Sequence, residues 1–303
     1  MKDVGPASWV GAILILLGTL GFSSKAILVK VIYEKMPDMA AISLMSLRMM
    51  MALPVFAVVA WLMHRRNSTH ISLKTNMGFM FLGAWGYYLA GFLDFSGLQL
   101  IPASLERLIL FLYPTLVVVF SAVAYKQKIT MKQAVALVIS YAGIAIVFIE
   151  QLSAGHSEHI KGSVLIALSA AVFAIYVMVS GQKIRKVGSH HFTAWAMTGA
   201  ALATLFHFVI TQPISQLSVD NDVLGITAIM ALFATILPAF LINAGIQRIG
   251  ASMAAIIGTA GPVFTLIMAW LFLGENLSSI QLLGMTVIIL GALLPVLEKQ
   301  KKP

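Results

Sequence analysis

The segment Gly97-Leu-Gln-Leu-Ile-Pro-Ala-Ser104 returns 148 residues later as Gly245-Ile-Gln-Arg-Ile-Gly-Ala-Ser252. At this offset, residues 97–150 align with residues 245–298 without a gap and give ten identities in 54 positions. Many of the matched residues are Gly, Pro or Gln, which a general bias toward apolar residues does not produce. The sequence therefore predicts an internal duplication. The identical pairs are Gly97/Gly245, Gln99/Gln247, Ile101/Ile249, Ala103/Ala251, Ser104/Ser252, Ile109/Ile257, Pro114/Pro262, Gln133/Gln281, Gly143/Gly291 and Glu150/Glu298.

The composition indicates a membrane protein. Of 303 residues, 60% are hydrophobic and 10% are charged, and the mean hydropathy is +0.95, whereas a soluble domain carries about 25% charged residues. A transmembrane helix needs roughly 20 apolar residues. The loops leave no room for a sizeable soluble domain, so we expect an all-α integral membrane protein. The ten predicted helices are at 9–32, 39–63, 77–98, 101–124, 133–149, 162–180, 191–211, 223–246, 249–273 and 280–297.

The positive charges predict the orientation of these helices. With the N-terminus inside, the cytoplasmic segments hold fourteen Lys and Arg residues, and the opposite side holds only Lys35 and Lys161. Cytoplasmic loops retain positive charge, so both termini are predicted to be cytoplasmic, and most of the net charge of +9 reflects topology and not a nucleic-acid surface. The fourteen are Lys2, Arg65, Arg66, Lys74, Lys126, Lys128, Lys132, Lys183, Arg185, Lys186, Arg248, Lys299, Lys301 and Lys302.

Ten helices and one duplication place five helices in each copy, residues 1–150 and residues 151–303. A weaker match at an offset of 151 extends the duplication, pairing Gly11-Ala12 with Gly162-Ser163 and Phe22 with Phe173. Because five is odd, the two copies must enter the membrane from opposite sides. Inverted repeats of this kind are common in secondary transporters, whose substrate site lies near the midplane.

The repeat motifs resemble those of the drug/metabolite transporter superfamily, in its EamA-type branch of ten helices. The resemblance rests on Gly245 to Ser252, Pro262, the segment Leu273-Gly-Glu-Asn276, Gln281, Gly284 and Gly291, with Gly97 to Ser104, Pro114 and Gly143 in the first copy. The first copy departs from the pattern, with Lys126-Gln127-Lys128 where the second has Gly274-Glu275-Asn276. The resemblance implies export or exchange of amino acids, related metabolites or drugs. It also implies a central cavity between helices 1, 3, 4, 6, 8 and 9, with helices 5 and 10 peripheral.

Six ionisable residues fall inside predicted helices of the first copy, in the outer half of the membrane. Their equivalents in the second copy are uncharged, so the repeat itself does not require them. Ionisable residues are costly in a membrane and are therefore paired or functional. They line a polar cavity or outer gate, or they form ion pairs that orient helices, with Lys30 reaching the headgroups. The six are Lys25, Lys30, Arg48, Asp94, Glu106 and Arg107.

Glu106 and Arg107 are adjacent, so their side chains point about 100° apart on a helix and cannot simply neutralise each other. At least one of them needs a partner on another helix. Glu106 is also a candidate site for proton coupling, provided that the two transport states bind the proton differently. The surplus of positive charge favours a substrate with a carboxylate or phosphate.

Polar and aromatic residues form a second group of candidates for substrate binding or gating. Tyr and Trp inside bundles more often pack or sit at the interface than touch a ligand. Pro114, Pro238 and Pro262 are candidate hinges or static kinks, because proline frees a helix carbonyl. The polar and aromatic candidates are Tyr87, Tyr113, Tyr176, Asn243 and Gln247, and Tyr88 and Trp195 belong to the same group of residues.

Enzyme and metal signatures are missing from the sequence. It has no Cys and none of the motifs HExxH, GxSxG, Walker A or GxGxxG. His156 and His159 have a metal-like spacing but lie in a polar loop without a further close ligand, and His207 is expected to be a hydrogen-bonded structural residue. We therefore expect no catalytic residue, no metal and no cofactor.

These observations favour a secondary transporter of the inner membrane that moves a small polar metabolite by alternating access, as exporter or exchanger. A transporter of phosphorylated or nucleotide-linked metabolites is the first alternative. A non-transporting sensor or an enzyme of lipid-linked substrates is the second, since fold does not fix function. The expected partners are the substrate and membrane lipids, with protons as a candidate coupling ion, a homodimer as a candidate assembly and no nucleic acid.

Overall fold

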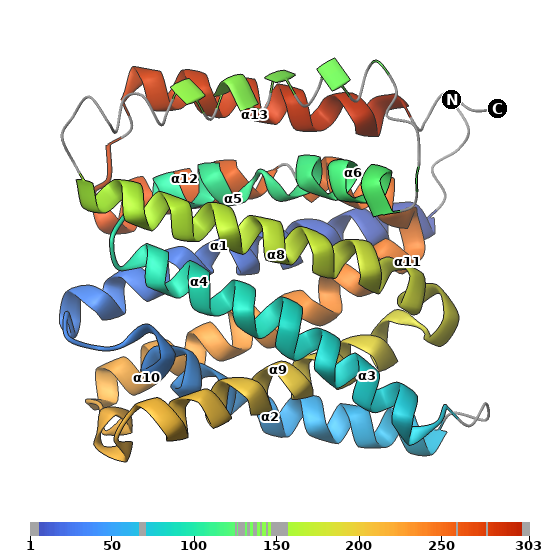
Figure 1. The fold of residues 1–303 in the computed structure, drawn as a ribbon, viewed down its shortest axis with the longest axis vertical. Coiled ribbons are helices and arrows are strands. Elements are labelled where there is room, and N and C mark those ends of the chain that lie inside the picture. Colours follow the sequence, from blue (N-terminus) through green and yellow to red (C-terminus); the bar gives the residue numbers. More distant parts are fainter. Residues whose placement is uncertain are drawn as a thin grey trace.

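The structure is a computed structural model. It describes residues 6–66, 71–124, 157–258, 260–276 and 278–298, with eleven further residues between 126 and 146. Throughout this described part the chain forms helices and turns, without a strand. The helices, several of which are labelled in Figure 1, are α1 (Pro6–Lys35), α2 (Ala41–Arg66), α3 (Leu73–Gly83), the π-helix η1 (Ala84–Tyr88), α4 (Leu89–Leu98), α5 (Ala103–Leu110), α6 (Tyr113–Ala124), α8 (Ser157–Val187), α9 (Ser189–Thr211), the 3-10 helix η2 (Ile214–Leu217), α10 (Asn221–Ala231), the π-helix η3 (Leu232–Ile236), α11 (Leu237–Gly258), α12 (Ala260–Leu273) and α13 (Ser279–Glu298).

Six helical segments among the described residues are long and apolar enough to span a membrane. Their lengths run from 22 to 29 residues, and a span needs roughly 20. Only nine of the 17 residues of the helix predicted at 133–149 are described, and those nine are helical. Figure 1 shows the start of α1 and the end of α13 at the same end of the bundle. The opposite end carries the loops at 36–40, 99–102 and 274–278 and is called here the predicted outer end.

Two predicted helices contain a π-helix, at Ala84–Tyr88 and at Leu232–Ile236. The two segments are 148 residues apart, which is the offset of the sequence repeat. Pro238 follows the second π-helix and has no N–H to donate, which favours an irregular turn before it. Ala90 stands at the equivalent place in the first copy, so proline is not needed for the irregular turn. The same irregular backbone in both halves is what a five-helix repeat predicts.

The predicted boundary between helices 8 and 9, at 246–249, is wrong. Helix α11 continues through Ile249 and ends at Gly258, and α12 begins at Ala260. In the first copy the chain does break, because Pro102 lies outside α5 as its N-cap residue. The second copy has Gly250 at the position of Pro102. Without a proline to remove a hydrogen bond, the helix is not interrupted there.

Helix pairs approach closely at glycines that occupy equivalent positions in the two copies. A Cβ atom built on Gly97 of α4 would lie 3.0 Å from the carbonyl oxygen of Gly162 on α8. A Cβ atom built on Gly245 of α11 would lie 3.0 Å from the carbonyl oxygen of Gly11 on α1. Small residues let helix backbones pack closely in membrane bundles. The α4–α8 and α1–α11 contacts are therefore built in the same way.

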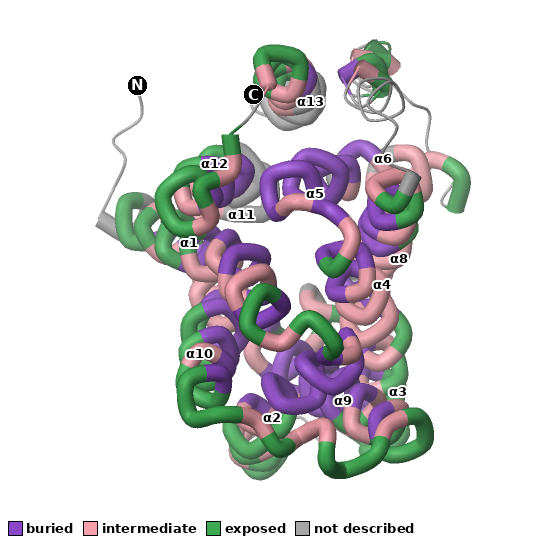
Figure 2. Tube along the Cα trace, turned by 90° about the vertical axis from the view of Figure 1, so that its left-hand side faces the viewer, coloured by how far each residue is buried: buried purple, intermediate pink, exposed green. Residues whose placement is uncertain are grey.

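The bundle encloses a central region, seen end-on in Figure 2. In this view α1, α2, α4, α5, α8, α9 and α10 surround it, and α13 lies apart from the other labelled helices. The peripheral place of α13 agrees with the expectation for helix 10. The expectation for helix 5 stays a prediction, because only nine of its 17 predicted residues are described.

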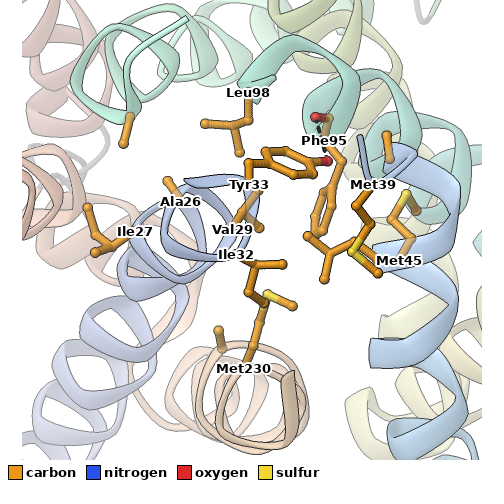
Figure 3. Close-up of a cluster of buried hydrophobic side chains, with 14 of the residues drawn as sticks. Ala26, Ile27, Val29, Ile32, Tyr33, Met39, Met45, Phe95, Leu98 and Met230 are labelled. Carbon is orange, nitrogen blue, oxygen red and sulfur yellow. Dashed lines mark hydrogen bonds between the residues drawn. The ribbon is translucent and has the colours of Figure 1, made fainter. Parts of the chain in front are cut away.

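An apolar core joins α1, α2, α4 and α10 toward the predicted outer end (Figure 3). Ile32, Phe95 and Met230 are almost completely buried in it. The hydroxyl of Tyr33 donates a hydrogen bond of 3.1 Å to the carbonyl oxygen of Phe95, which satisfies its polar atom inside the core. Along their helices, Ile32 and Tyr33 of α1 lie nearer the outer loops than Lys25, and Phe95 of α4 lies nearer them than Asp94.

Candidate functional site

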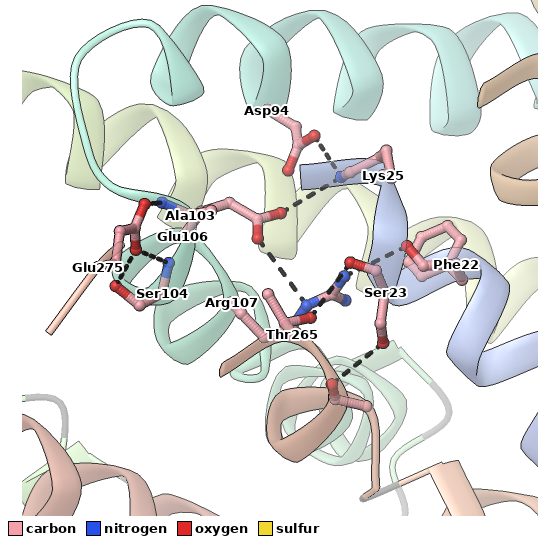
Figure 4. A network of polar contacts seen from close by, with 11 residues as sticks. Phe22, Ser23, Lys25, Asp94, Ala103, Ser104, Glu106, Arg107, Thr265 and Glu275 are labelled. Atoms are coloured by element: carbon pink, nitrogen blue, oxygen red, sulfur yellow. Dashed lines mark hydrogen bonds and ion pairs between the residues drawn. The ribbon is translucent and has the colours of Figure 1, made fainter. Parts of the chain in front are cut away.

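Five of the six intramembrane charges are buried and come from four helices. Lys25 lies on α1, Arg48 on α2, Asp94 on α4, and Glu106 and Arg107 on α5. Figure 4 shows Lys25 pointing between the carboxylates of Asp94 and Glu106. The bundle thus brings together residues that are up to 82 positions apart in the sequence. We call these five residues the charge cluster.

Lys25 is the centre of the charge cluster. Its Nζ atom lies 2.5 Å from Asp94 Oδ2 and 3.2 Å from Glu106 Oε1. The side chains are 6%, 4% and 0% exposed, respectively. Buried ions lose their hydration, and only close, hydrogen-bonded contacts offset that loss. One ammonium group therefore holds two buried carboxylates, and among the described residues it is the only ion-pair partner of Asp94.

The prediction that Glu106 or Arg107 needs a partner on another helix is confirmed. Glu106 contacts Lys25 of α1, and its Oε2 atom is 3.9 Å from Arg107 Nε. Arg107 also donates from an Nη atom to the carbonyl oxygen of Phe22, at 3.4 Å. Its guanidinium carbon lies 5.5 Å from the centre of the Phe22 ring. Helices α1, α4 and α5 are therefore tied together by charge inside the bundle.

Arg48 differs from the other two cations of the cluster. Among the described residues it makes no ion pair, although its side chain is buried. Its guanidinium carbon lies 4.6 Å from the centre of the Phe95 ring. Its Nε atom has no hydrogen-bond partner, and the same is true of Asp94 Oδ1, Glu106 Oε2 and Arg107 Nε. Buried polar atoms without partners are uncommon in folded proteins, so the charge cluster is not a fully satisfied structural network.

A cavity of about 70 Å³ lies beside the charge cluster. A water molecule needs roughly 10–15 Å³ of such space, so a few waters fit, whereas sites for small molecules measure about 300–1,000 Å³. A metabolite can enter only if helices separate. The lining residues are Phe22, Lys25, Arg48, Tyr87, Ala90, Gly91, Asp94, Phe95, Arg107, Leu110, Phe111, Tyr113, Ser169 and Phe173.

Aromatic rings form the wall of the cavity toward α8. The ring centre of Tyr113 is 5.3 Å from that of Phe173, which lies 5.9 Å from that of Tyr176. Tyr87 lies 6.2 Å from Tyr176. Tyr87 and Tyr113 thus line the cavity as predicted candidates, and Tyr176 packs behind it. Sequence reasoning missed Phe173 and Phe22 as site residues, although their match at an offset of 151 had marked them as equivalent.

Other candidate residues lie away from the cavity. Asn243 donates a hydrogen bond to Thr193. Gln247 lies within the unbroken part of α11, and its side chain is exposed. Lys30 donates a hydrogen bond of 3.2 Å to the carbonyl oxygen of Leu98, so its ammonium group is bound within the protein near the predicted outer end. The structure thus separates these three residues from the charge cluster.

Tyr88, Trp195 and the histidines have structural contacts. Tyr88 shares a hydrogen bond of 2.7 Å with His207, as expected of a structural histidine. Trp195 packs against His64 and His191 at the opposite end from the outer loops. Within the described residues no group of three metal-binding side chains occurs. His156 lies outside them.

Two of the candidate hinge prolines begin helices instead of bending them. Pro114 is the second residue of α6, after an interruption at Phe111–Leu112, and Pro262 is the third residue of α12. Proline is tolerated in a first turn, where N–H groups lack helical partners. Pro238 follows the π-helix at Leu232–Ile236 and packs against Gly21. A further proline, Pro54 inside α2, was not among the candidates.

Glu275 is another residue that sequence reasoning did not place in a site. From the loop before α13, its carboxylate accepts hydrogen bonds from the backbone N–H groups of Ala103 and Ser104, at 2.8 and 3.0 Å. It also accepts one from the Ser104 hydroxyl, at 2.6 Å (Figure 4). The carboxylate therefore caps α5 in place of Pro102, whose side chain cannot. This contact joins two loops of the predicted outer end.

Comparison with known proteins identifies relatives over most of the chain. A protein of Bacillus subtilis named "Uncharacterized transporter YcbK" is 30% identical over 279 residues, covering 90% of this chain and 88% of that protein. The "S-adenosylmethionine/S-adenosylhomocysteine transporter" of Chlamydia trachomatis is 23% identical over 243 residues, covering 76% of this chain and 73% of that protein. Both relatives are named as transporters, which agrees with a role other than catalysis.

A crystal structure that is 17% identical in sequence has the same fold, with a TM-score of 0.65 over 99% of this chain and 100% of the other. The model of the EamA-like transporter family matches residues 9–149 and again residues 160–297. Each matched segment lies within one of the two halves expected from the internal duplication. With these matches over most of its length and six helices able to span a membrane, the chain is a multi-pass membrane protein that belongs to the EamA-like transporter family.

Proposed function

We propose that the protein is a secondary transporter of the inner membrane that moves a small polar metabolite by alternating access, as exporter or exchanger. The observation that carries this proposal is the charge cluster beside a cavity between α1, α2, α4, α5, α6 and α8. A structural network would satisfy all its polar atoms, whereas this cluster leaves four buried atoms without hydrogen-bond partners. Three of the residues that carry these atoms, Arg48, Asp94 and Arg107, line the cavity. Groups of this kind are suited to hold a polar solute during passage.

Alternating access fits the arrangement of contacts along the bundle. The apolar core around Phe95 and the Glu275 cap lie between the charge cluster and the predicted outer end. In the proposed cycle these outer contacts separate when the site opens outward. The two halves, residues 1–150 and 151–303, would exchange their conformations as inverted repeats with both termini in the cytoplasm.

Proton coupling is the second part of the proposal. Glu106 is completely buried and contacts Lys25, whereas Asp94 contacts Lys25 and is one of the residues that line the cavity. Glu106 is not among the lining residues, so Asp94 is the nearer candidate for a proton that enters from the cavity. If protons are coupled, we expect Asp94→Asn to remove the pH dependence of flux and Glu106→Gln to weaken it. Unchanged pH profiles in both variants would exclude the cluster as the coupling site.

The experiment that tests the proposal is counterflow in proteoliposomes with a panel of amino acids, organic acids, phosphorylated metabolites and organic cations. S-adenosylmethionine belongs in the panel because of the chlamydial relative. We expect at least one compound to exchange, and Asp94→Asn to slow that exchange. Asp222→Asn is the matched control, because Asp222 is 79% exposed and pairs with Lys35, which is also exposed. Absence of exchange for every compound would count against transport of small polar metabolites.

A second candidate, transport of phosphorylated metabolites, is favoured by one observation. The charge cluster holds three cations and two carboxylates, and guanidinium groups bind phosphate well. In the same counterflow assay, competition by sugar phosphates but not by amino acids would select this candidate.

A further inference from the structure

We infer that Arg48 binds the anionic group of the transported molecule, a carboxylate or a phosphate, and that Asp94 accepts a hydrogen bond from a donor of the same molecule. The inference rests on the proposed function and names the chemistry of its substrate. It assigns unequal roles within the charge cluster: Lys25 and Arg107 hold the protein's own carboxylates, and Arg48 is kept for the substrate.

The pairing of charges separates Arg48 from the other cations. Lys25 contacts both carboxylates of the cluster, and Arg107 lies beside Glu106 and the Phe22 carbonyl. Among the described residues, no carboxylate is paired with Arg48, which is 3% exposed. A buried cation without a counter-ion is costly. An anion that enters the cavity would remove this cost, so binding would be selective for a negative group.

The position of the guanidinium suits such an anion. It lies over the face of α4 that carries Gly91, Asp94 and Phe95, three residues that one helical turn brings together. One Nη atom is 3.9 Å from where a Cβ atom of Gly91 would lie, and the guanidinium carbon is 4.6 Å from the Phe95 ring centre. Arg48 and Asp94 both line the cavity. One wall therefore combines a guanidinium that makes no ion pair among the described residues with a carboxylate.

A purely structural role explains Arg48 less well. Its contact with the Phe95 ring is a cation–π interaction, which is weaker than the cost of burying an unpaired cation. The equivalent position in the second copy, at an offset of 151, is Gly199, which packs against the backbone of Met80. The repeat therefore builds the same helix position without a charge. Arg48 is an addition to the fold and not a requirement of it.

Uptake by proteoliposomes tests the inference with matched compounds. One series is L-leucine, its hydroxy-acid analogue 2-hydroxyisocaproate and its decarboxylated amine isoamylamine, with a parallel series for L-serine. Glycerol 3-phosphate and O-phosphoserine form the phosphate arm. We expect wild-type protein to take up compounds with an anionic group and to exclude the amines. Transport confined to the phosphate arm would identify phosphate as the anion, and transport confined to the acids would identify carboxylate.

The variants are Arg48→Gln, Arg48→Lys and the control Arg65→Gln. Arg65 lies on the same helix but is exposed and packs on Trp61. Loss of a charge-assisted contact predicts a rise of about tenfold or more in the half-saturating concentration for Arg48→Gln. Arg48→Lys should recover part of that loss, and Arg65→Gln should behave as wild type. A single elution peak in size-exclusion chromatography shows that each variant is folded.

The outcomes separate the inference from the proposed function. Uptake of amines as fast as acids, or unchanged half-saturation in folded Arg48→Gln protein, would overturn the role of Arg48 and leave the transport function standing. Failure of the wild-type protein to move any compound of either arm would count against the transport function itself.

Discussion

The two halves of the molecule share features of backbone geometry, but the residues of the charge cluster in the first half have no charged equivalents in the second. The π-helices at Ala84–Tyr88 and Leu232–Ile236 are separated by the offset of the sequence repeat, and so are the close helix contacts at Gly97 and Gly245. Asp94, by contrast, has Ile242 as its counterpart. Features repeated in both halves are those that bundle packing needs. Features present in only one half are candidates for the chemistry of a particular substrate.

The counterparts of the charged residues show what the fold uses when no charge is present. Tyr176 stands at the position of Lys25 and stacks with Phe173. Gly199 stands at the position of Arg48, and Ile242 packs against Gly18. Aromatic stacking and close helix approach thus replace ion pairs. The comparison predicts that removing a charge destabilises the fold only where another buried charge depends on it.

Replacing Lys25 should have the largest effect on stability. Lys25→Met leaves the carboxylates of Asp94 and Glu106 buried without their main counter-ion. Breaking a buried ion pair from one side costs about 3–5 kcal/mol, so we expect a large fall in the melting temperature of the purified protein. Lys35→Met is the control, because the Lys35–Asp222 pair is exposed at 3.4 Å and such pairs contribute about 0–1 kcal/mol.

Neutralising the orphaned carboxylate of Asp94 should restore stability. The double variant Lys25→Met, Asp94→Asn removes the Lys25–Asp94 pair and leaves Glu106 with Arg107 as its counter-ion, so it should melt above Lys25→Met alone. Equal melting temperatures for Lys25→Met and Lys35→Met would mean that the cluster is hydrated and that its charges do not depend on one another.

Replacing the glycine at either of the two equivalent helix contacts should destabilise the fold by a similar amount. A Cβ atom on Gly97 or Gly245 would crowd the side chain of Ile166 or Ile15, respectively, besides a glycine carbonyl oxygen 3.0 Å away. Overpacking costs about 1–3 kcal/mol, so we expect Gly97→Ala and Gly245→Ala to lower the melting temperature by similar amounts. Gly78→Ala is the control, because its Cβ would have no neighbour within 4 Å. A loss at only one of the two sites would show that they are not equivalent.

Sequence reasoning predicted the features that depend on length and local pattern. Apolar runs marked α1, α2 and α9 within three residues of their ends, whereas α8 begins five residues before and ends seven residues after the predicted range 162–180. The adjacency of Glu106 and Arg107 predicted a partner on another helix. The same reasoning predicted a helix boundary at 246–249, but Gly250 does not interrupt α11 as Pro102 interrupts the chain in the first copy.

The remaining features depend on contacts between distant parts of the chain. Glu275 caps α5 from 172 residues away, and no pattern near Glu275 in the sequence predicts this contact. The π-helix at Ala84–Tyr88 has no proline after it. Gln247 was a candidate because it is polar inside an apolar segment, but the sequence alone does not say which face of the helix reaches the cavity.

Removing the Glu275 cap should have an intermediate effect. Loss of an N-cap costs about 0.5–2 kcal/mol, and Glu275→Ala also releases the contact between two outer loops. The chain has no cysteine, so Ser169→Cys can report access to the cavity that Ser169 lines. We expect a membrane-impermeant thiol reagent to label the Glu275→Ala protein faster from outside. Equal labelling rates would show that the cap does not hold the outer end.

Replacing Arg48 should have the smallest effect on stability, although it lies in the same charge cluster as Lys25. Arg48→Gln removes a buried cation on which no described carboxylate depends, so the loss of the Phe95 contact is offset by the loss of an uncompensated charge. We therefore expect a melting temperature equal to or above that of the wild type without substrate. With a transported acid present, wild-type protein should gain stability by mass action and Arg48→Gln should not. A clear fall in melting temperature without substrate would mean that Arg48 supports the fold, and the contrast with Gly199 would then reflect a difference in packing.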